Sequence, residues 1–113
     1  MRNITEERIV YKPFEYPEAF DFYLKQQQAH WLWTEVPMMA DVTDWKSNLS
    51  ETEKNIIGSI LKGFAQTETV VNDYWSNLVT KWFRKPEIIA MGVCFANMET
   101  VHAEAYSLLN EEL

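Results

Sequence analysis

The sequence is poor in residues that other classes of protein require. It has only three glycines, and this scarcity together with long apolar periodicity predicts helices rather than strands. Its single cysteine, Cys94, can form no internal disulfide and is expected to be a small buried residue. No apolar run approaches the roughly 20 residues of a membrane span, and the N-terminus lacks the apolar segment of a secretion signal. These absences predict a cytoplasmic protein without a membrane anchor.

Basic residues are also scarce, whereas aromatic residues are abundant. There are 10 basic and 17 acidic side chains, and the net charge of −7 argues against a nucleic-acid partner. Five tryptophans, five tyrosines and six phenylalanines are many for a single domain of 113 residues, which should bury only about two-thirds of its surface. We therefore expect that some aromatic side chains face another polypeptide, or that the chain is part of a larger fold.

Apolar periodicity predicts three helices, the first of which begins after Pro17. A proline at the first helical position and Glu18 in the first turn are typical of a helix N-terminus, and the pattern continues to about Trp33. The periodicity then lapses over residues 34–49. This stretch is predicted to be a surface loop with Trp45 tucked back against the protein.

The second helix is predicted to begin at a capping box, Ser50-Glu-Thr-Glu53, and to run to about Trp75. One face carries polar residues, and the opposite stripe comprises Ile57, Leu61, Phe64, Glu68, Val71 and Trp75. Glu68 thus lies in the middle of the apolar face. An unpaired carboxylate there would cost several kcal/mol or would have to stay protonated.

The third helix is predicted to run from near Pro86, with Glu87 in its first turn, to Leu113. It is apolar nearly all round, which is typical of a helix at the centre of a bundle. Its innermost stripe comprises Ile88, Gly92, Phe95, Glu99, His102, Ala103 and Tyr106. A carboxylate, an imidazole and a phenol again occupy positions that periodicity predicts to be apolar.

Glu99 and His102 are three residues apart, so they project from the same face of a helix with Cβ atoms about 5–6 Å apart. Together with one carboxylate from a neighbouring antiparallel helix, such a pair is half of the ligand set of a dimetal-carboxylate site. A lone Glu-x-x-His is more often a surface pair or a satisfied core histidine. Here Glu68 lies in the same way on a second apolar helix, and this conjunction favours a metal site.

Three ordered motifs accompany these residues. They are Phe95-Ala-Asn-Met-Glu-Thr-Val-His-Ala-Glu-Ala-Tyr-Ser107, Phe64-Ala-Gln-Thr-Glu-Thr-Val-Val, and Trp31-x-x-x-Glu35-Val36. Along nearly the whole chain they resemble the small, radical-generating subunit of class I ribonucleotide reductase. The resemblance implies an all-α, ferritin-like helical bundle, of which this sequence would form the N-terminal half.

The resemblance also implies a role for each matching residue. Glu68, Glu99 and His102 would bind metal, either two iron ions or manganese in place of one or both. Tyr106 would carry a stable radical, and Trp31 would relay an electron to the large, catalytic subunit. This chemistry starts the reduction of ribonucleotides to deoxyribonucleotides. Glu68 stands where many members have aspartate, which leaves the donor type unchanged.

The family supplies its remaining ligands from a later helix pair that this sequence does not contain. We therefore expect one incomplete domain, with an N-terminal helix and loop over residues 1–49 and the first ligand-bearing helix pair over residues 50–113. A second polypeptide would carry the remaining ligands, and the completed subunit would form a homo-oligomer.

Two other functions remain open from the residues. Two copies of the chain could combine their ligands in a ferritin-like dimetal oxidase or metal store. Alternatively, the chain could be a non-catalytic helical module whose exposed apolar surface binds another protein.

Overall fold

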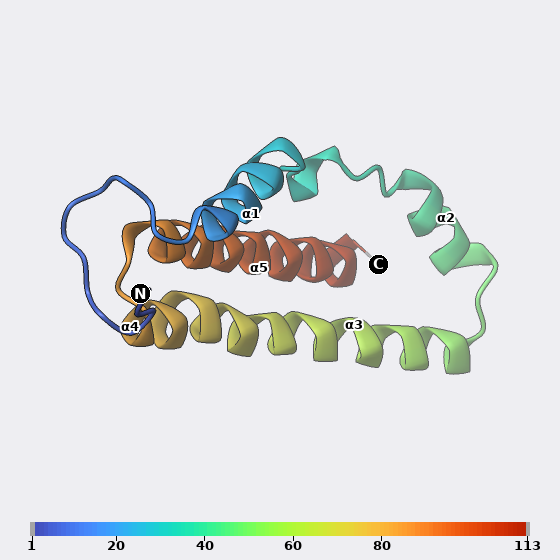
Figure 1. The fold of residues 1–113 in the computed structure, drawn as a ribbon. Helices are drawn as coiled ribbons and strands as arrows, with labels where there is room; N and C mark the ends of the chain where they lie inside the picture. The colour runs from blue at the N-terminus through green and yellow to red at the C-terminus, as the bar shows by residue number, and fades with distance from the viewer. Residues whose placement is uncertain (1, 113) are drawn as a thin grey trace. The chain divides into compact units, whose positions relative to one another are not determined.

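The computed structural model describes residues 2–112, and every regular element among them is helical. In chain order these elements are α1 (Pro17–Gln28), the 3-10 turn η1 (Trp33–Glu35), α2 (Met39–Ser47), α3 (Glu51–Asp73), the π-helical segment η2 (Tyr74–Val79), α4 (Thr80–Trp82) and α5 (Pro86–Glu112) (Figure 1). The predicted all-α fold is confirmed. Leu113, the predicted end of the third helix, lies outside the described residues.

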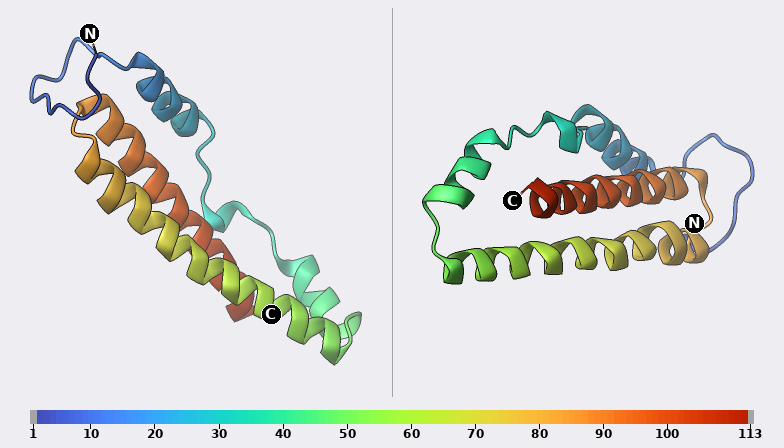
Figure 2. Two further views of the ribbon diagram at one scale, coloured as in Figure 1. Left: turned by 60° about the horizontal axis from the view of Figure 1, so that its bottom comes forward. Right: turned by 180° about the vertical axis from the view of Figure 1, so that it is seen from behind.

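The chain divides into two compact units. The first unit comprises Met1–His30 and Val70–Glu99, and the second comprises Trp31–Thr69 and Thr100–Leu113. Figure 2 shows that α3 and α5 are both continuous helices. Each of them has one stretch in the first unit and one stretch in the second. Aromatic contacts join the α5 stretch to its neighbour within each unit. Trp75 and Phe95 have ring centroids 4.9 Å apart in the first unit, and Phe64 and Tyr106 have centroids 5.4 Å apart in the second.

Helix α1 begins at Pro17, as predicted, but ends earlier than predicted. It stops at Gln28, five residues before the expected end at Trp33, and the backbone is already extended at Leu32. The predicted end is wrong because Trp31 and Trp33, which prolong the apolar pattern, are half-buried side chains outside this helix. Their spacing reflects tertiary packing rather than helical periodicity.

The loop predicted over residues 34–49 is also wrong, because α2 occupies Met39–Ser47. Asp41, which suggests a turn in the sequence, lies in the first turn of this helix. An acidic residue is favourable there because it faces the positive end of the helix dipole. Trp45 is half-buried and lies beside Gly58 of α3, so the tucked-back tryptophan is confirmed.

The capping box predicted for α3 is confirmed. The Glu53 N–H donates to Ser50 Oγ at 3.1 Å, and the Ser50 N–H donates to the Glu53 carboxylate at 2.9 Å. Helix α3 runs to Asp73 and passes directly into η2 and α4. The helical backbone therefore continues to Trp82, beyond the predicted end near Trp75.

The polar face predicted for α3 is exposed, whereas its apolar face is only partly covered. The exposed polar residues are Asn55, Ser59, Lys62, Gln66, Thr69 and Asp73. On the apolar stripe Leu61 and Val71 are half-buried, but Ile57 is 37% exposed and Phe64 is 49% exposed. The described residues thus leave apolar surface of α3 open to solvent.

The core of the first unit packs η2 against the beginning of α5. Its buried residues are Ala19, Val79 and Ile88, surrounded by Tyr16, Trp75, Phe83 and Met91. Gly92 permits this approach, because a Cβ there would lie 3.2 Å from the carbonyl oxygen of Trp75 and 3.3 Å from the methyl carbon of Thr80. Cys94 is buried, as predicted.

Buried charges hold the segment before α1 to the beginning of α5. Glu87 is fully buried and accepts hydrogen bonds from Arg8 and from the backbone N–H groups of Glu15, at 2.8 Å, and Tyr16, at 3.0 Å. Lys85 is 2% exposed and pairs with the Glu15 carboxylate at 3.0 Å. The sequence indicates only an acidic first turn and a basic loop edge at these positions.

These contacts change the acidity of both carboxylates. Burial alone would raise the pKa of Glu87, but hydrogen bonds from Arg8 and from backbone N–H groups outweigh it and lower the pKa from 4.5 to about 2. Hydrogen bonds from Lys85 and Arg8 likewise lower the pKa of Glu15. The structure therefore stabilises the charged form of each.

We predict that the chain loses stability as the pH falls from about 4.5 to about 2. The folded-state pKa of Glu87 lies below the unfolded value, so its contribution is complete above 4.5 and is lost as the pH falls through about 2. The full contribution is about 3 kcal/mol. Urea unfolding across this pH range should show a decrease in the free energy of unfolding of the wild type, and a smaller decrease for Glu87→Gln. The exposed Glu18→Gln variant should show the same decrease as the wild type. A decrease in Glu87→Gln as large as that of the wild type would contradict the assignment to Glu87.

A second prediction concerns two helical glycines with opposite surroundings. Gly92→Ala should lower the free energy of unfolding by about 1–3 kcal/mol, because its Cβ meets a backbone oxygen that cannot move aside. Gly63→Ala should raise it by up to about 1 kcal/mol, because nothing lies within 4 Å and alanine favours a helix. Urea denaturation of both variants checks the signs, and effects of the same sign would contradict the proposed close approach.

Candidate metal centre

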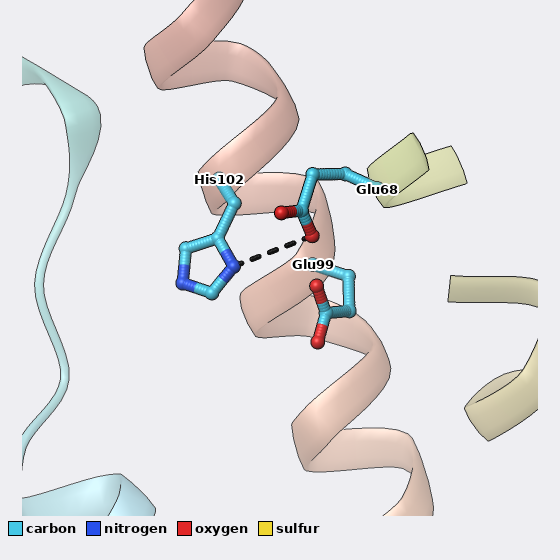
Figure 3. Close-up of side chains that lie close together, drawn as sticks. All are labelled: Glu68, Glu99 and His102. Atoms are coloured by element: carbon cyan, nitrogen blue, oxygen red, sulfur yellow. Dashed lines mark ion pairs between the residues drawn. The ribbon is translucent and has the colours of Figure 1, made fainter. Parts of the chain in front are cut away.

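Two long helices bring a carboxylate and an imidazole together in the second unit. Glu68 lies on α3 and His102 lies on α5, and Glu68 Oε2 is 3.4 Å from His102 Nδ1 (Figure 3). The two side chains are 17% and 35% exposed. Because both residues lie within regular helix, the backbone rather than a loop determines their positions.

The Glu68 carboxylate is incompletely satisfied. Its Oε2 atom is buried and accepts no hydrogen bond from the described residues, so the 3.4 Å contact with His102 lacks hydrogen-bond geometry. A buried acceptor without a donor costs about 1–3 kcal/mol, and more for a charged group. A bound cation would compensate it.

Glu99 lies one helical turn before His102 on α5 and is half-buried. One donor atom from each of Glu68, Glu99 and His102 lies within 4.8 Å of the others. Figure 3 shows the two carboxylates and the imidazole facing one another. The structure thus brings together the three residues that the family resemblance implies as metal ligands.

The donor set suits iron or manganese, which bind carboxylate oxygen and imidazole nitrogen. Donor atoms on one octahedral ion with bonds of about 2.1 Å stand roughly 3–4 Å apart, so the observed spacing needs only small side-chain rotations. The residues therefore fit a metal ion. Dimetal sites in helical bundles use four carboxylates and two imidazoles, of which these residues are half.

Tyr106 lies one turn beyond His102 on α5 and is half-buried. Its ring lies against that of Phe64, with centroids 5.4 Å apart and ring planes tilted by 48°. Phe64 lies one turn before Glu68 on α3, and periodicity predicts it only as a member of the apolar stripe. Its four-residue spacing from Glu68 is the signal that it faces the same side.

Trp31 contacts the candidate ligand histidine directly. Its indole stacks on the imidazole of His102, with ring centroids 5.8 Å apart and planes 28° from parallel. Two other polar side chains do not join the cluster, since His30 and Glu104 are both exposed. The tryptophan and the histidine, which are far apart in the sequence, are therefore neighbours in the second unit.

The fold is all-helical, and two of its helices carry carboxylates and a histidine with the spacing of a metal site. This combination is typical of dimetal-carboxylate proteins built on a helical bundle. The family model described as ribonucleotide reductase, small chain, matches residues 8–113. The chain belongs to this family, which is ferritin-like in fold, so the resemblance inferred from the motifs is confirmed. No helix within residues 2–112 is long and apolar enough to cross a membrane.

Curated relatives carry the same family name. The chain is 37% identical to the probable ribonucleoside-diphosphate reductase small subunit of Invertebrate iridescent virus 6, over 98% of this chain and 31% of the relative. It is 32% identical to the small subunit of Dictyostelium discoideum, over 95% of this chain and 32% of the relative. For the small chain of Neurospora crassa the identity is 34%, over 91% of this chain and 25% of the relative. The chain thus spans between a quarter and a third of the length of these relatives.

We predict that Glu68→Leu abolishes stabilisation by metal without unfolding the chain. In the wild type, Mn²⁺ or Fe²⁺ should raise the thermal midpoint, because ions bind the folded state. The variant should show no such shift. Without metal it should be as stable as the wild type or more stable by about 1–2 kcal/mol, because a buried oxygen without a hydrogen bond has been removed.

Glu104→Leu is the matched control, since Glu104 is an exposed carboxylate on α5. It should respond to metal as the wild type does. If metal still raises the thermal midpoint of Glu68→Leu, Glu68 is not a ligand of the site. A large loss of metal-free stability in Glu68→Leu would show that the carboxylate serves as a structural partner of His102.

Proposed function

We propose that the chain supplies the first half of a dimetal site, and the radical-bearing tyrosine, to a class I ribonucleotide reductase small subunit. The convergence of Glu68 on His102, with Glu99 one turn earlier, is the observation that supports this most. These three residues bind metal in the proposal. The remaining ligands come from a further helix pair outside residues 1–113.

The metals are two iron ions, or manganese in place of one or both. When bound, the metal pair supplies the oxidising power for radical formation. His102 directs Nδ1 towards the Glu68 carboxylate, so this nitrogen must be unprotonated to bind a cation. The side chain of Glu68 is one methylene longer than the aspartate common in the family. A rotamer change absorbs that difference while the donor type stays the same.

Tyr106 is the residue that is oxidised in this proposal. It loses one electron and its phenolic proton, and it regains both when the radical is passed on. The ring of Phe64 packs against it, with centroids 5.4 Å apart. Trp31 relays the electron, and its stacking on His102 gives it direct contact with a proposed metal ligand.

The proposed partners follow from the family. The completed small subunit works as a homo-oligomer with the large, catalytic subunit, in the cytoplasm, to produce deoxyribonucleotides. The names of the relatives support the subunit assignment, since each is called a small subunit or small chain of ribonucleoside-diphosphate reductase. The net charge of −7 is unfavourable for nucleic-acid binding.

The test is reconstitution of the small subunit from this chain and a polypeptide that carries the second ligand helix pair. Bound iron and manganese are measured by elemental analysis, and the tyrosyl radical is measured by electron paramagnetic resonance. We predict that two metal ions per site bind only when both polypeptides are present, whereas this chain alone binds a single ion through its three ligands. Tyr106→Phe should retain the metal and lose the radical, because phenylalanine has no phenolic proton to give up.

Trp31→Phe separates the relay from the metal site. It should keep both metal and radical, because it changes neither a ligand nor Tyr106, and it should lose most deoxyribonucleotide formation with the large subunit. Absence of metal from the reconstituted subunit would overturn the proposal. A full radical signal in Tyr106→Phe would overturn the assignment of that tyrosine alone.

A further inference from the structure

Residues 2–16, here called the N-terminal arm, precede α1 and contain no helix or strand. Figures 1 and 2 show the arm as a wide loop outside the helices. Its middle is open to solvent, with Ile9 89% exposed, Val10 67% exposed and Tyr11 54% exposed. Burial of apolar surface therefore contributes little to the conformation of this part of the arm.

Arg8 forms most of the hydrogen bonds that join different parts of the arm. A guanidinium has five N–H donors, and all five are engaged. They bond to the backbone carbonyls of Val10 and Tyr11 and to the carboxylates of Glu15 and Glu87. The side chain is only 14% exposed. Lysine has three donors on a flexible stem and could not reproduce this arrangement.

Glu87 links Arg8 and the end of the arm to α5. One carboxylate oxygen accepts from the backbone N–H groups of Glu15 and Tyr16, at 2.8 and 3.0 Å, and both oxygens accept from Arg8. A further ion pair, from Lys85 to Glu15 at 3.0 Å, closes the cluster on its other side. Arg8, Glu15, Lys85 and Glu87 thus form an ionic cluster, here called the latch, in which Lys85 and Glu87 are buried and Arg8 and Glu15 are partly buried.

The latched arm completes the wall of an apolar pocket in the first unit. The pocket has a volume of about 460 Å³, and Ile4 and Tyr16 of the arm line it. Phe83 and residues of α1, η2 and α5 form the remaining walls, among them Phe22, Trp75 and Met91. Displacement of the arm would remove one side of this pocket and expose the apolar surface behind it.

We propose that the latch holds the part of the N-terminal arm around Arg8 closed against α5, whereas Phe14 and Tyr16 hold the end of the arm by packing on Phe20 and on the core, so that the part around Arg8 opens when Glu87 loses its charge-assisted hydrogen bonds. All four latch residues belong to the first unit. The proposal therefore does not depend on the metal site, and either can fail without the other. The arm acts as a strap over the pocket.

Trypsin measures this opening directly on the full chain. To cut the Arg8–Ile9 bond the protease must take the Arg8 side chain into its acidic specificity pocket, which requires Arg8 to leave the latch. The cleavage rate thus reports the population of the open arm. Glu87→Gln should raise that rate at least about tenfold near neutral pH, because the amide cannot accept all the hydrogen bonds of the carboxylate.

The bond after Arg2 is an internal reference. Arg2 pairs with Glu18 at 3.1 Å, but both side chains are 55% exposed, so this cut needs no opening of the latch. Glu18→Gln is the matched control, because it removes an ion pair of the same arm at an exposed position. It should leave the rate at Arg8–Ile9 within about twofold of wild type.

Glu15→Gln keeps the test decisive if Glu87→Gln does not fold, as judged by circular dichroism. It weakens the links from Arg8 and Lys85 while Glu87 remains, so it should raise the Arg8–Ile9 rate by a smaller factor than Glu87→Gln. A rate unchanged from wild type in a folded Glu87→Gln or Glu15→Gln variant would overturn the latch. An equal rise in Glu18→Gln would also overturn it, because the arm would then be held no more firmly by buried than by exposed pairs.

Discussion

A carboxylate inside a helical protein has to be compensated by cations or by hydrogen-bond donors, and this chain does so in two different ways. Glu87 receives an arginine and two N–H groups of the preceding segment, all from the same chain, so its charge contributes to the stability of the fold. Glu68 has a buried oxygen, Oε2, that lies 3.4 Å from His102 Nδ1 and accepts no hydrogen bond from the described residues. The first carboxylate is satisfied within the chain, whereas the second keeps a buried oxygen without a hydrogen bond, which is the oxygen that the proposed metal site would use.

The helices that carry these acids also explain the unusual composition. Helix α5 is apolar nearly all round, and Val101 on its reverse side is 2% exposed. The apolar face of α3 remains partly open, with Ile57 37% exposed and Phe64 49% exposed. This surface is compatible with both expectations from the composition, namely that some aromatic side chains face another polypeptide or that the chain is part of a larger fold. It also accords with a chain that spans only part of the length of its relatives.

Features that depend on local sequence were predictable, and features that depend on distant contacts were not. The beginning of α1 at Pro17 and the capping box of α3 follow from neighbouring residues, and both are confirmed. Helix α2 was missed because its nine residues carry too little apolar periodicity to distinguish a helix from a loop. The latch was missed because nothing near Arg8 indicates a partner 79 residues away.

The sequence by itself determined the helical class, the family, and the helical stripes that hold Glu68, Glu99, His102 and Tyr106. It could do so because the period of an α-helix relates residues three or four positions apart without reference to the rest of the fold. Only the tertiary structure decided which distant groups meet: the carboxylate of Glu68 and the imidazole of His102, the indole of Trp31 on that imidazole, and Arg8 on Glu87. Such pairings depend on how helices pack, and packing is a property of the whole chain rather than of any local pattern.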